Sequence, residues 1–186
     1  IWIMSTNHVV SMPDANAVKA ALEACPFVVV SDIQKDTDTA RLAHVLLPAS
    51  GWGEKSGTVT NSERRISRQR PLLPVPGGAR ADWWQLAEVG KRLGFGPDFD
   101  YRDPADIYAE HAALSAFENN GERDFDIGAH AEINVEDYDA LLPFQWPLRQ
   151  YGPSSPRFFA EGGFFTPDRK ARLVPVMAPE PEETDA

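Results

Sequence analysis

The run PFVVVSD, residues 26–32, constrains the fold of this chain more than any other stretch of its sequence. Three β-branched valines follow one another without polar alternation, which is typical of a strand in a parallel sheet buried on both faces. Two further apolar runs, IWIMST at residues 1–6 and HVLLPAS at residues 44–50, lie on either side of it along the chain. The sequence therefore predicts three buried strands before residue 51.

Segments with helical character separate these strands. ANAVKAALEA, residues 15–24, has apolar side chains at helical spacing and follows Pro13 and Asp14, a pair typical of a helix start. DTDTARLA, residues 36–43, predicts a second and shorter helix. Strands that alternate with helices in this way indicate right-handed βαβ units. The predicted fold class is therefore α/β, a three-layer βαβ domain with a mainly parallel sheet.

Further helices are expected after the sheet. Residues 81–95 have the clearest amphipathic pattern, and residues 103–117 form another that opens with Asp103 and Pro104 as cap and first turn. A short helix is expected within residues 134–143. The expected packing positions of the first of these helices are Trp83, Trp84, Leu86, Ala87, Val89 and Leu93.

The end of the chain predicts a hairpin and then a linker. Residues 157–167 and 171–176 are expected to pair as a C-terminal hairpin that turns through Gly162 and Gly163. The tail, residues 177–186, is rich in Pro and Glu and is typical of a disordered linker. We therefore expect one α/β domain over residues 1–176, followed by this linker.

The formal net charge of −10 is carried by the second half of the chain. Residues 1–100 carry eleven Lys and Arg against eleven Asp and Glu, whereas residues 101–186 carry seven against seventeen. A phosphorylated ligand is therefore expected to bind in the first half, where cations are not outnumbered. The basic string ERRISRQR, residues 63–70, lacks the interleaved aromatic side chains of a nucleic-acid interface, so no nucleic-acid partner is expected.

Cysteine and histidine usage excludes several kinds of site. The single Cys25 can form neither an internal disulfide nor a cysteine-built metal site, which favours a reducing, cytoplasmic compartment. The four histidines are not spaced as metal ligands, and no catalytic triad is evident. No apolar stretch approaches the roughly 20 residues of a membrane span. Because the chain opens at Ile1 within an apolar run and without an initiator Met, we interpret it as a segment of a larger subunit.

Polar residues follow each of the three predicted strands, and ligands of open α/β sheets bind at such strand ends. Asp32 stands where dinucleotide sites keep an acid for a ribose hydroxyl or a base edge, although a turn or capping role is the alternative. The first turn, STNHVVSMPD, contains no glycine, so a pyrophosphate cannot lie against it as in NAD-binding domains. The residues expected to converge are Ser5, Thr6, Asn7, Ser31, Asp32 and Gly51 to Lys55.

The segment GWGEKSGTVTNSERRISRQR, residues 51–70, combines glycines, a tryptophan, acidic and basic residues and an asparagine. A surface loop tolerates almost any hydrophilic sequence and does not require this specific mixture. Lys55 can neutralise a phosphate or contact a base carbonyl, and the glycines allow close backbone approach. The alternative is an ion pair between Glu54 and Lys55 on a solvated hairpin. Further along, Asn61, Glu63, Arg64 and Arg65 can form either a buried network or an anion site.

The block LPASGWGEKSGTVTNSERRISRQRPLLPVPGGARADWW, residues 47–84, resembles a segment of the bis-molybdopterin guanine dinucleotide oxidoreductases of the dimethyl-sulfoxide-reductase superfamily. WIMSTN upstream, with HAALSAFENNGERDFDI and GGFFTPDRKARLVPV downstream, makes bacterial assimilatory nitrate reductases the nearest group. The resemblance covers nearly the whole chain. It implies that the polar turn lies against one guanine dinucleotide arm of a buried cofactor.

The resemblance also implies which residues contact that cofactor: Asn7, Ser31, Asp32, Lys55 and Asp82. Without the resemblance, Asp82 is interpreted as an acidic residue at a helix N-terminus, where the helix dipole favours negative charge. The chain departs from the family pattern at His8, where relatives commonly have Pro. This difference concerns the exact shape of the loop around Asn7, and not the assignment of Asn7 as a cofactor contact. Neither the cysteine motif for the family's 4Fe-4S cluster nor the molybdenum-ligating Cys is in this chain.

By resemblance, the chain is the cofactor-binding middle domain of a molybdenum nitrate reductase, and we expect it to be inactive by itself. The parent reduces nitrate to nitrite with a bis-molybdopterin guanine dinucleotide and a 4Fe-4S cluster in an N-terminal part. Its partners are the other domains of the subunit and an electron-donor protein. Two alternatives stay open: the same domain of a formate dehydrogenase, and a non-catalytic scaffold or electron-transfer subunit.

Overall fold

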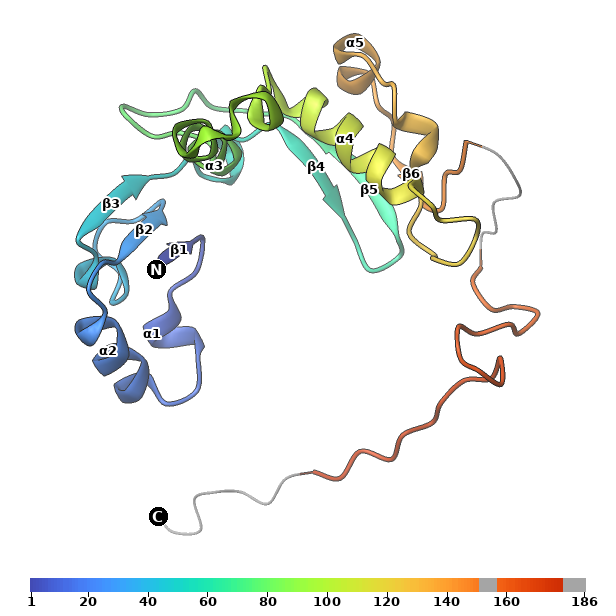
Figure 1. Ribbon diagram of the computed structural model, residues 1–186, viewed down its shortest axis with the longest axis horizontal. Helices are drawn as coiled ribbons and strands as arrows, with labels where there is room; N and C mark the ends of the chain where they lie inside the picture. The colour runs from blue at the N-terminus through green and yellow to red at the C-terminus, as the bar shows by residue number, and fades with distance from the viewer. Residues whose placement is uncertain (151–156, 179–186) are drawn as a thin grey trace.

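The computed structural model describes residues 1–150 and 157–178 (Figure 1). Two small sheets occupy the two arms of an arch, and helix α3 (Asp82–Gly90) lies between them. Each sheet has its own hydrophobic cluster. Residues 157–178 run away from the second arm as an irregular trace.

The first sheet is parallel, as the β-branched runs predict. Its strands are β1 (Trp2–Met4), β2 (Val29–Asp32) and β3 (Val45–Pro48), in the order β1-β2-β3. Val30 at its centre pairs with Ile3 on one side and Leu46 on the other. Because every strand of this sheet is parallel, the three carboxyl ends meet at one edge.

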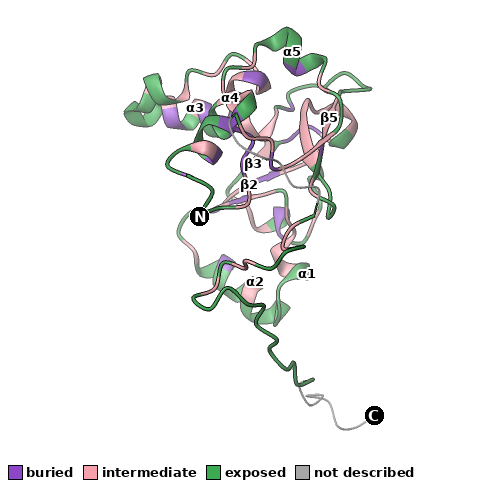
Figure 2. Cartoon of the chain, turned by 90° about the vertical axis from the view of Figure 1, so that its right-hand side faces the viewer, coloured by how far each residue is buried: buried purple, intermediate pink, exposed green. Residues whose placement is uncertain are grey.

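Helical segments contact both faces of this sheet, with α3 reaching the second face at the carboxyl end of β2. Helices α1 (His8–Ser11) and α2 (Ala15–Ala24) and the 3-10 turn η1 (Ala40–Leu42) belong to the face whose core contains Ile3, Leu22, Val28, Val30 and Ala40. On the other face Ser31 of β2 donates a 2.6 Å hydrogen bond to Gln85 of α3. The outer sides of α1 and α2 are exposed (Figure 2). The α/β class predicted from the sequence is confirmed.

The second sheet is antiparallel. It contains β4 (Gly57–Thr60), β5 (Arg65–Gln69) and β6 (Phe144–Gln145) in that order. The same arm contains three helical segments: α4 (Pro104–Ala116), the 3-10 turn η5 (Gly128–His130) and α5 (Val135–Asp139). The core of this arm is formed by Ile66, Ala105, Tyr108, Ala112, Ile127 and Tyr138.

Helix α4 begins where the sequence predicts. The Asp103 side chain accepts from the backbone N–H groups of Ala105 and Asp106, and Pro104 occupies the first turn. These contacts satisfy donors that the first turn of a helix leaves without partners. α4 has 13 residues. No helix in the described ranges combines the length and the apolar character needed to cross a membrane.

The packing face predicted for α3 is largely wrong. Trp84, Leu86 and Val89 are exposed, and so is Leu93 in the π-helical continuation η3 (Lys91–Phe95). The buried positions are Gln85, Ala87 and Gly90, which are smaller or polar. The Phe99 ring packs directly against Gly90 and leaves no room for a Cβ at that position. Phe99 is the last residue of the 3-10 turn η4 (Gly96–Phe99). α3 therefore presents much of its apolar surface outward within this chain.

The predicted C-terminal hairpin is also wrong in its position, because residues 157–178 contain no strand. Gly162 and Gly163 do adopt positive φ, and Phe164 N–H donates to the Arg169 carbonyl, so a turn forms there. The rings of Phe159 and Phe164 stack at 4.4 Å, and the segment turns back on itself instead of pairing as two strands. The antiparallel hairpin of this protein is β4–β5 instead. Most of the predicted linker, residues 179–186, lies outside the described residues.

Candidate functional site

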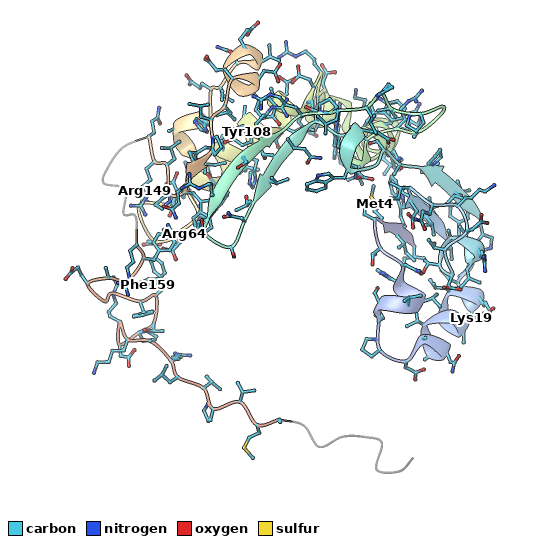
Figure 3. The ribbon with its side chains drawn as sticks, turned by 180° about the vertical axis from the view of Figure 1, so that it is seen from behind. Met4, Lys19, Arg64, Tyr108, Arg149 and Phe159 are labelled. Atoms are coloured by element: carbon cyan, nitrogen blue, oxygen red, sulfur yellow. The ribbon has the colours of Figure 1, made fainter. Side chains whose placement is uncertain are left out.

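A cavity of about 430 Å³ lies at the carboxyl ends of the three parallel strands. This is the edge at which open α/β sheets bind ligands, and the volume is in the range of small-molecule sites. Met4, the last residue of β1, lies on the concave side of the arch (Figure 3). The lining residues are Ser5, Thr6, Asn7, Asp32, Ile33, Gln34, Thr37, Ala49, Ser50, Gly51, Trp52 and Lys55.

Lys55 reaches this cavity from the turn that follows β3. The turn is built on the 3-10 helix η2 (Trp52–Glu54), whose Glu54 carboxylate accepts a 2.6 Å hydrogen bond from Gly51 N–H. Glu54 therefore serves as a capping group. The ion pair between Glu54 and Lys55 considered from the sequence does not form, because the Lys55 ammonium pairs with Asp82 instead.

Asp82 is the first residue of α3 and joins the site through Lys55. The Lys55 Nζ donates to Asp82 Oδ2 at 2.6 Å, and both side chains are about three-quarters buried, with exposures of 28% and 27%. The other oxygen, Asp82 Oδ1, is buried without a hydrogen-bond partner. A buried carboxylate oxygen without a partner is costly unless a donor reaches it. Asp82 does not itself line the cavity.

Asn7 is held in place by Thr39, a residue that the sequence interpretation missed. The Asn7 Oδ1 accepts from Thr39 N–H at 3.2 Å and from the Thr39 hydroxyl at 2.8 Å. The Thr39 Oγ1 in turn accepts from Val9 N–H at 3.0 Å, and Thr39 is fully buried. These bonds tie the loop after β1 to the loop after β2. Since Oδ1 is engaged, the Asn7 amide N–H₂ is the group left to donate to a ligand.

Asp32 and Ser31 are adjacent in β2 but face different environments. Asp32 lines the cavity, and its Oδ1 accepts from Gln34 N–H at 3.1 Å, which leaves Oδ2 as an acceptor. The Ser31 side chain is fully buried on the opposite face of the sheet, where it accepts from Trp2 Nε1 at 2.8 Å and bonds Gln85. The structure thus brings Asn7, Asp32 and Lys55 together, whereas the Ser31 side chain points away from them.

Ser50 is a further member of the lining that the sequence interpretation did not single out, and Trp52 lies within the expected range Gly51 to Lys55 but was given no role of its own. Ser50 is fully buried, and its hydroxyl oxygen has no hydrogen-bond partner. Trp52 is 70% exposed, although it is a large aromatic side chain. The position of Ser50 directly after the third strand was the signal that could have identified it.

The polar segment after β4 forms a structural network. Asn61 Oδ1 accepts from the N–H groups of Glu63 and Arg65, which closes the turn between β4 and β5. The Arg64 guanidinium donates to the Trp146 carbonyl at 2.6 Å and lies 3.9 Å from the centre of the Phe158 ring. The contacts support a network, but not the buried one that was predicted, because Asn61, Glu63 and Arg65 are exposed and Arg64 is only half-buried.

Tyr108 and His130 form a titratable pair outside the cavity. The Tyr108 hydroxyl and His130 Nδ1 are 2.8 Å apart in the core of the second arm. Burial raises the pKa of the Tyr108 phenol and lowers the pKa of the His130 imidazole, because both charged forms are poorly solvated there. In the described part of the chain, no three His, Cys, Asp or Glu side chains are gathered as metal ligands.

Comparisons with known proteins identify a matching family and several similar proteins. Residues 1–92 match the sequence profile of the molybdopterin oxidoreductase family. The whole chain is 53% identical to a nitrate reductase of Klebsiella oxytoca, and 99% of it is 47% identical to a nitrate reductase of Shewanella frigidimarina. Over 59% of its length it is 44% identical to the alpha subunit of an F420-dependent formate dehydrogenase of Methanocaldococcus jannaschii. The chain spans 21%, 20% and 16% of these relatives' lengths, respectively.

Proposed function

Residues 1–92 belong to the molybdopterin oxidoreductase family, and we propose that this chain is the cofactor-binding segment of a larger catalytic subunit that reduces nitrate to nitrite. The proposal covers residues 1–176 as an α/β domain of that subunit. The observation that carries it is the cavity at the strand ends, where Asn7, Asp32 and Lys55 meet.

The lining of the cavity fits a nucleotide arm of the cofactor. It offers an amide donor on Asn7, a carboxylate acceptor on Asp32 and an ammonium on Lys55, which match the base edge, the ribose and the phosphates of a dinucleotide. Ser50 Oγ and Asp82 Oδ1 are buried without partners in the chain alone. Buried polar groups of this kind favour a site completed by a polar ligand. We therefore propose the guanine dinucleotide form of the cofactor.

The roles proposed for this chain are binding and orientation. When bound, the molybdenum cofactor supplies the metal centre at which nitrate loses an oxygen atom. Lys55, held by Asp82, presents its remaining N–H donors to an anionic or carbonyl group of the ligand. Asn7, fixed by Thr39, presents its amide N–H₂ group from the neighbouring loop. Ser31, whose side chain is turned away, contributes indirectly, through its carbonyl, which accepts from Ser5 N–H, and through the anchoring of Gln85.

The proposed parent has further parts and partners. They are the other domains of the subunit, a 4Fe-4S cluster in its N-terminal part and an electron-donor protein, in a cytoplasmic location consistent with the single Cys25. Nitrate is favoured as the substrate because the nitrate reductase relatives match nearly the whole chain at 53% and 47% identity. Formate is the alternative substrate, because a formate dehydrogenase subunit matches at 44% identity over 59% of the chain.

The test uses the full-length protein with Asp32→Asn or Lys55→Ala. Each change removes a charge-assisted contact worth about 1.5–3 kcal/mol. This corresponds to roughly ten- to hundred-fold weaker cofactor retention, because about 1.4 kcal/mol is tenfold. We expect molybdenum and guanine nucleotide per polypeptide to fall, while nitrate reduction per bound molybdenum stays near that of the unmodified protein. Metal analysis, nucleotide release and assays with reduced dye measure these quantities.

Matched controls come from the loop after β2, close to Asp32 along the chain. Lys35→Ala and Asp36→Asn alter exposed charges that do not line the cavity, and both should leave the cofactor content unchanged. Melting temperatures of all variants separate cofactor loss from unfolding. If the Asp32 and Lys55 variants keep full molybdenum but lose turnover per molybdenum, the two residues act in the chemistry and the proposal is wrong. Activity with formate in place of nitrate would select the alternative substrate.

A further inference from the structure

Two large apolar side chains are exposed at the otherwise polar cavity. Trp52, in η2 after β3, is 70% exposed, and Ile33, after β2, is 63% exposed. Both line the cavity together with Asp32 and Lys55. Isolated exposed apolar residues need no explanation, but an aromatic and an aliphatic side chain on one small cavity offer apolar surface to a ligand.

A third residue of the same lining lacks a partner. Ser50 is fully buried, its hydroxyl oxygen makes no hydrogen bond, and its backbone N–H is already used by the Arg80 carbonyl. A buried hydroxyl without a partner costs free energy unless a ligand or water satisfies it. Ser50 thus points to a polar ligand at the place where Trp52 offers an aromatic face.

We propose that Trp52 is the stacking platform for the planar base of a purine nucleotide, with Ile33 as additional apolar surface and the Ser50 hydroxyl as a further hydrogen-bonding group. This inference rests on the proposed function, because it names how the nucleotide arm is held. It adds binding residues to the Asn7, Asp32 and Lys55 set. Base stacking on an aromatic side chain is tolerant of base identity because every base has a π face.

Selection among bases then falls to the polar residues. The Asp32 carboxylate only accepts hydrogen bonds, so it favours a base edge that carries N–H donors. Guanine offers a carboxylate two adjacent donors, N1–H and the exocyclic N2 amino group, whereas adenine offers only its N6 amino group beside the N1 acceptor. The site is therefore expected to hold guanine more tightly than adenine, with Trp52 supplying affinity and Asp32 supplying the preference.

The experiment is a calorimetric titration of the 186-residue chain with GDP as the probe and ADP as the comparison. Trp52→Ala should weaken GDP binding about five- to hundred-fold, the range measured when stacking aromatics are replaced by alanine. Trp52→Phe keeps an aromatic face and should stay within about threefold of the unmodified chain. Ser50→Ala should weaken binding about two- to tenfold. Trp84→Ala is the matched control, since Trp84 is exposed but does not line this cavity.

The outcomes separate this inference from the proposed function. If Asp32→Asn weakens GDP binding but Trp52→Ala leaves it unchanged, the nucleotide site stands and the stacking role is wrong. If the unmodified chain binds neither GDP nor ADP, both the stacking role and the nucleotide site in this chain are overturned. Equal loss in Trp52→Ala and Trp84→Ala also contradicts the proposal. Circular dichroism and melting of each variant identify any substitution that unfolds the chain. If Trp52→Ala unfolds it, GDP binding is compared between Trp52→Phe, which keeps an aromatic face, and Trp52→Leu, which does not. Equal GDP binding by these two variants would overturn the stacking role.

Discussion

The ammonium of Lys55 lies 2.6 Å from the carboxylate Oδ2 of Asp82, a residue 27 positions further along the chain. The contact joins the turn after β3 to the first residue of α3. It fixes a flexible lysine side chain at the edge of the cavity, and it places a carboxylate at the helix N-terminus, where the dipole favours it. One ion pair therefore links the position of α3 to the arrangement of the candidate site.

Breaking this ion pair should destabilise the chain modestly. Lys55→Met and Asp82→Asn are each expected to lower the free energy of unfolding by about 0.5–1 kcal/mol, since the pair is partly exposed and solvent screens it. Urea unfolding of both variants and of the double variant gives the coupling free energy. It should shrink in 1 M salt, where the screening length is about 3 Å. A coupling of zero at low salt would mean that the contact contributes nothing to stability.

Thr39→Val should be more damaging than its conservative shape suggests. The change removes the hydroxyl that donates to Asn7 Oδ1 and accepts from Val9 N–H in a fully buried position. Val9 N–H is then left without this acceptor, whereas Asn7 Oδ1 keeps the 3.2 Å bond from Thr39 N–H. A buried group without a partner costs about 1–3 kcal/mol. We expect a loss of roughly 2 kcal/mol in unfolding free energy and weaker GDP binding, because Asn7 loses the shorter of its two bonds to Thr39. Thr39→Ser, which keeps the hydroxyl, should recover most of both, and failure to do so would refute this role.

The elements that the sequence predicts well are those specified by local chemistry. The β-branched run of β2 and the Asp103–Pro104 start of α4 are local signals, and both elements form there. The shared position of Asn7, Asp32 and Lys55 follows from topology, because parallel strands bring their carboxyl ends to one edge. That they bind a cofactor remains a proposal.

Features that depend on distant partners were not predictable. The pattern of α3 identifies Trp84 and Leu86 as apolar but contains no information on what covers them, and in this chain both are exposed. Gly162 and Gly163 indicate a turn, but a hairpin also needs two segments in matched register, and residues 157–178 do not pair. The role of Thr39 depends on a side chain 32 residues away, so no local pattern reveals it.

Gly128→Ala should destabilise the second arm. A Cβ at Gly128 would lie 2.5 Å from the Ala116 Cβ, at the point where η5 packs against the end of α4. Overpacking of this kind typically costs about 1–3 kcal/mol, so the melting temperature should fall. Gly78→Ala is the control, since a Cβ there meets nothing within 4 Å. Adding Ala116→Gly to Gly128→Ala should restore part of the loss, and an unchanged melting temperature in the single variant would contradict the close contact.

The unfolding free energy should depend on pH through His130. Burial lowers the pKa of its imidazole, so the folded state holds the ring neutral, with Nδ1 facing the Tyr108 hydroxyl at 2.8 Å. The unfolded chain, with a His pKa of about 6.5, binds more protons than the folded chain below that pH. Stability from this group is thus complete above about pH 6.5 and falls as the pH decreases toward the folded pKa.

Urea unfolding of the unmodified chain and of His130→Gln at pH 7.5 and pH 5.5 tests this dependence. The glutamine cannot take up a proton but can accept from Tyr108, so the variant lacks the pH-dependent contribution of this site. His8, His44 and His111 are present in both proteins and cancel in the difference. Because one proton contributes at most about 1.4 kcal/mol per pH unit, the unmodified chain should lose up to about 1 kcal/mol more than the variant over this interval. An equal loss in the two proteins would show that His130 is not held neutral by burial in the folded chain.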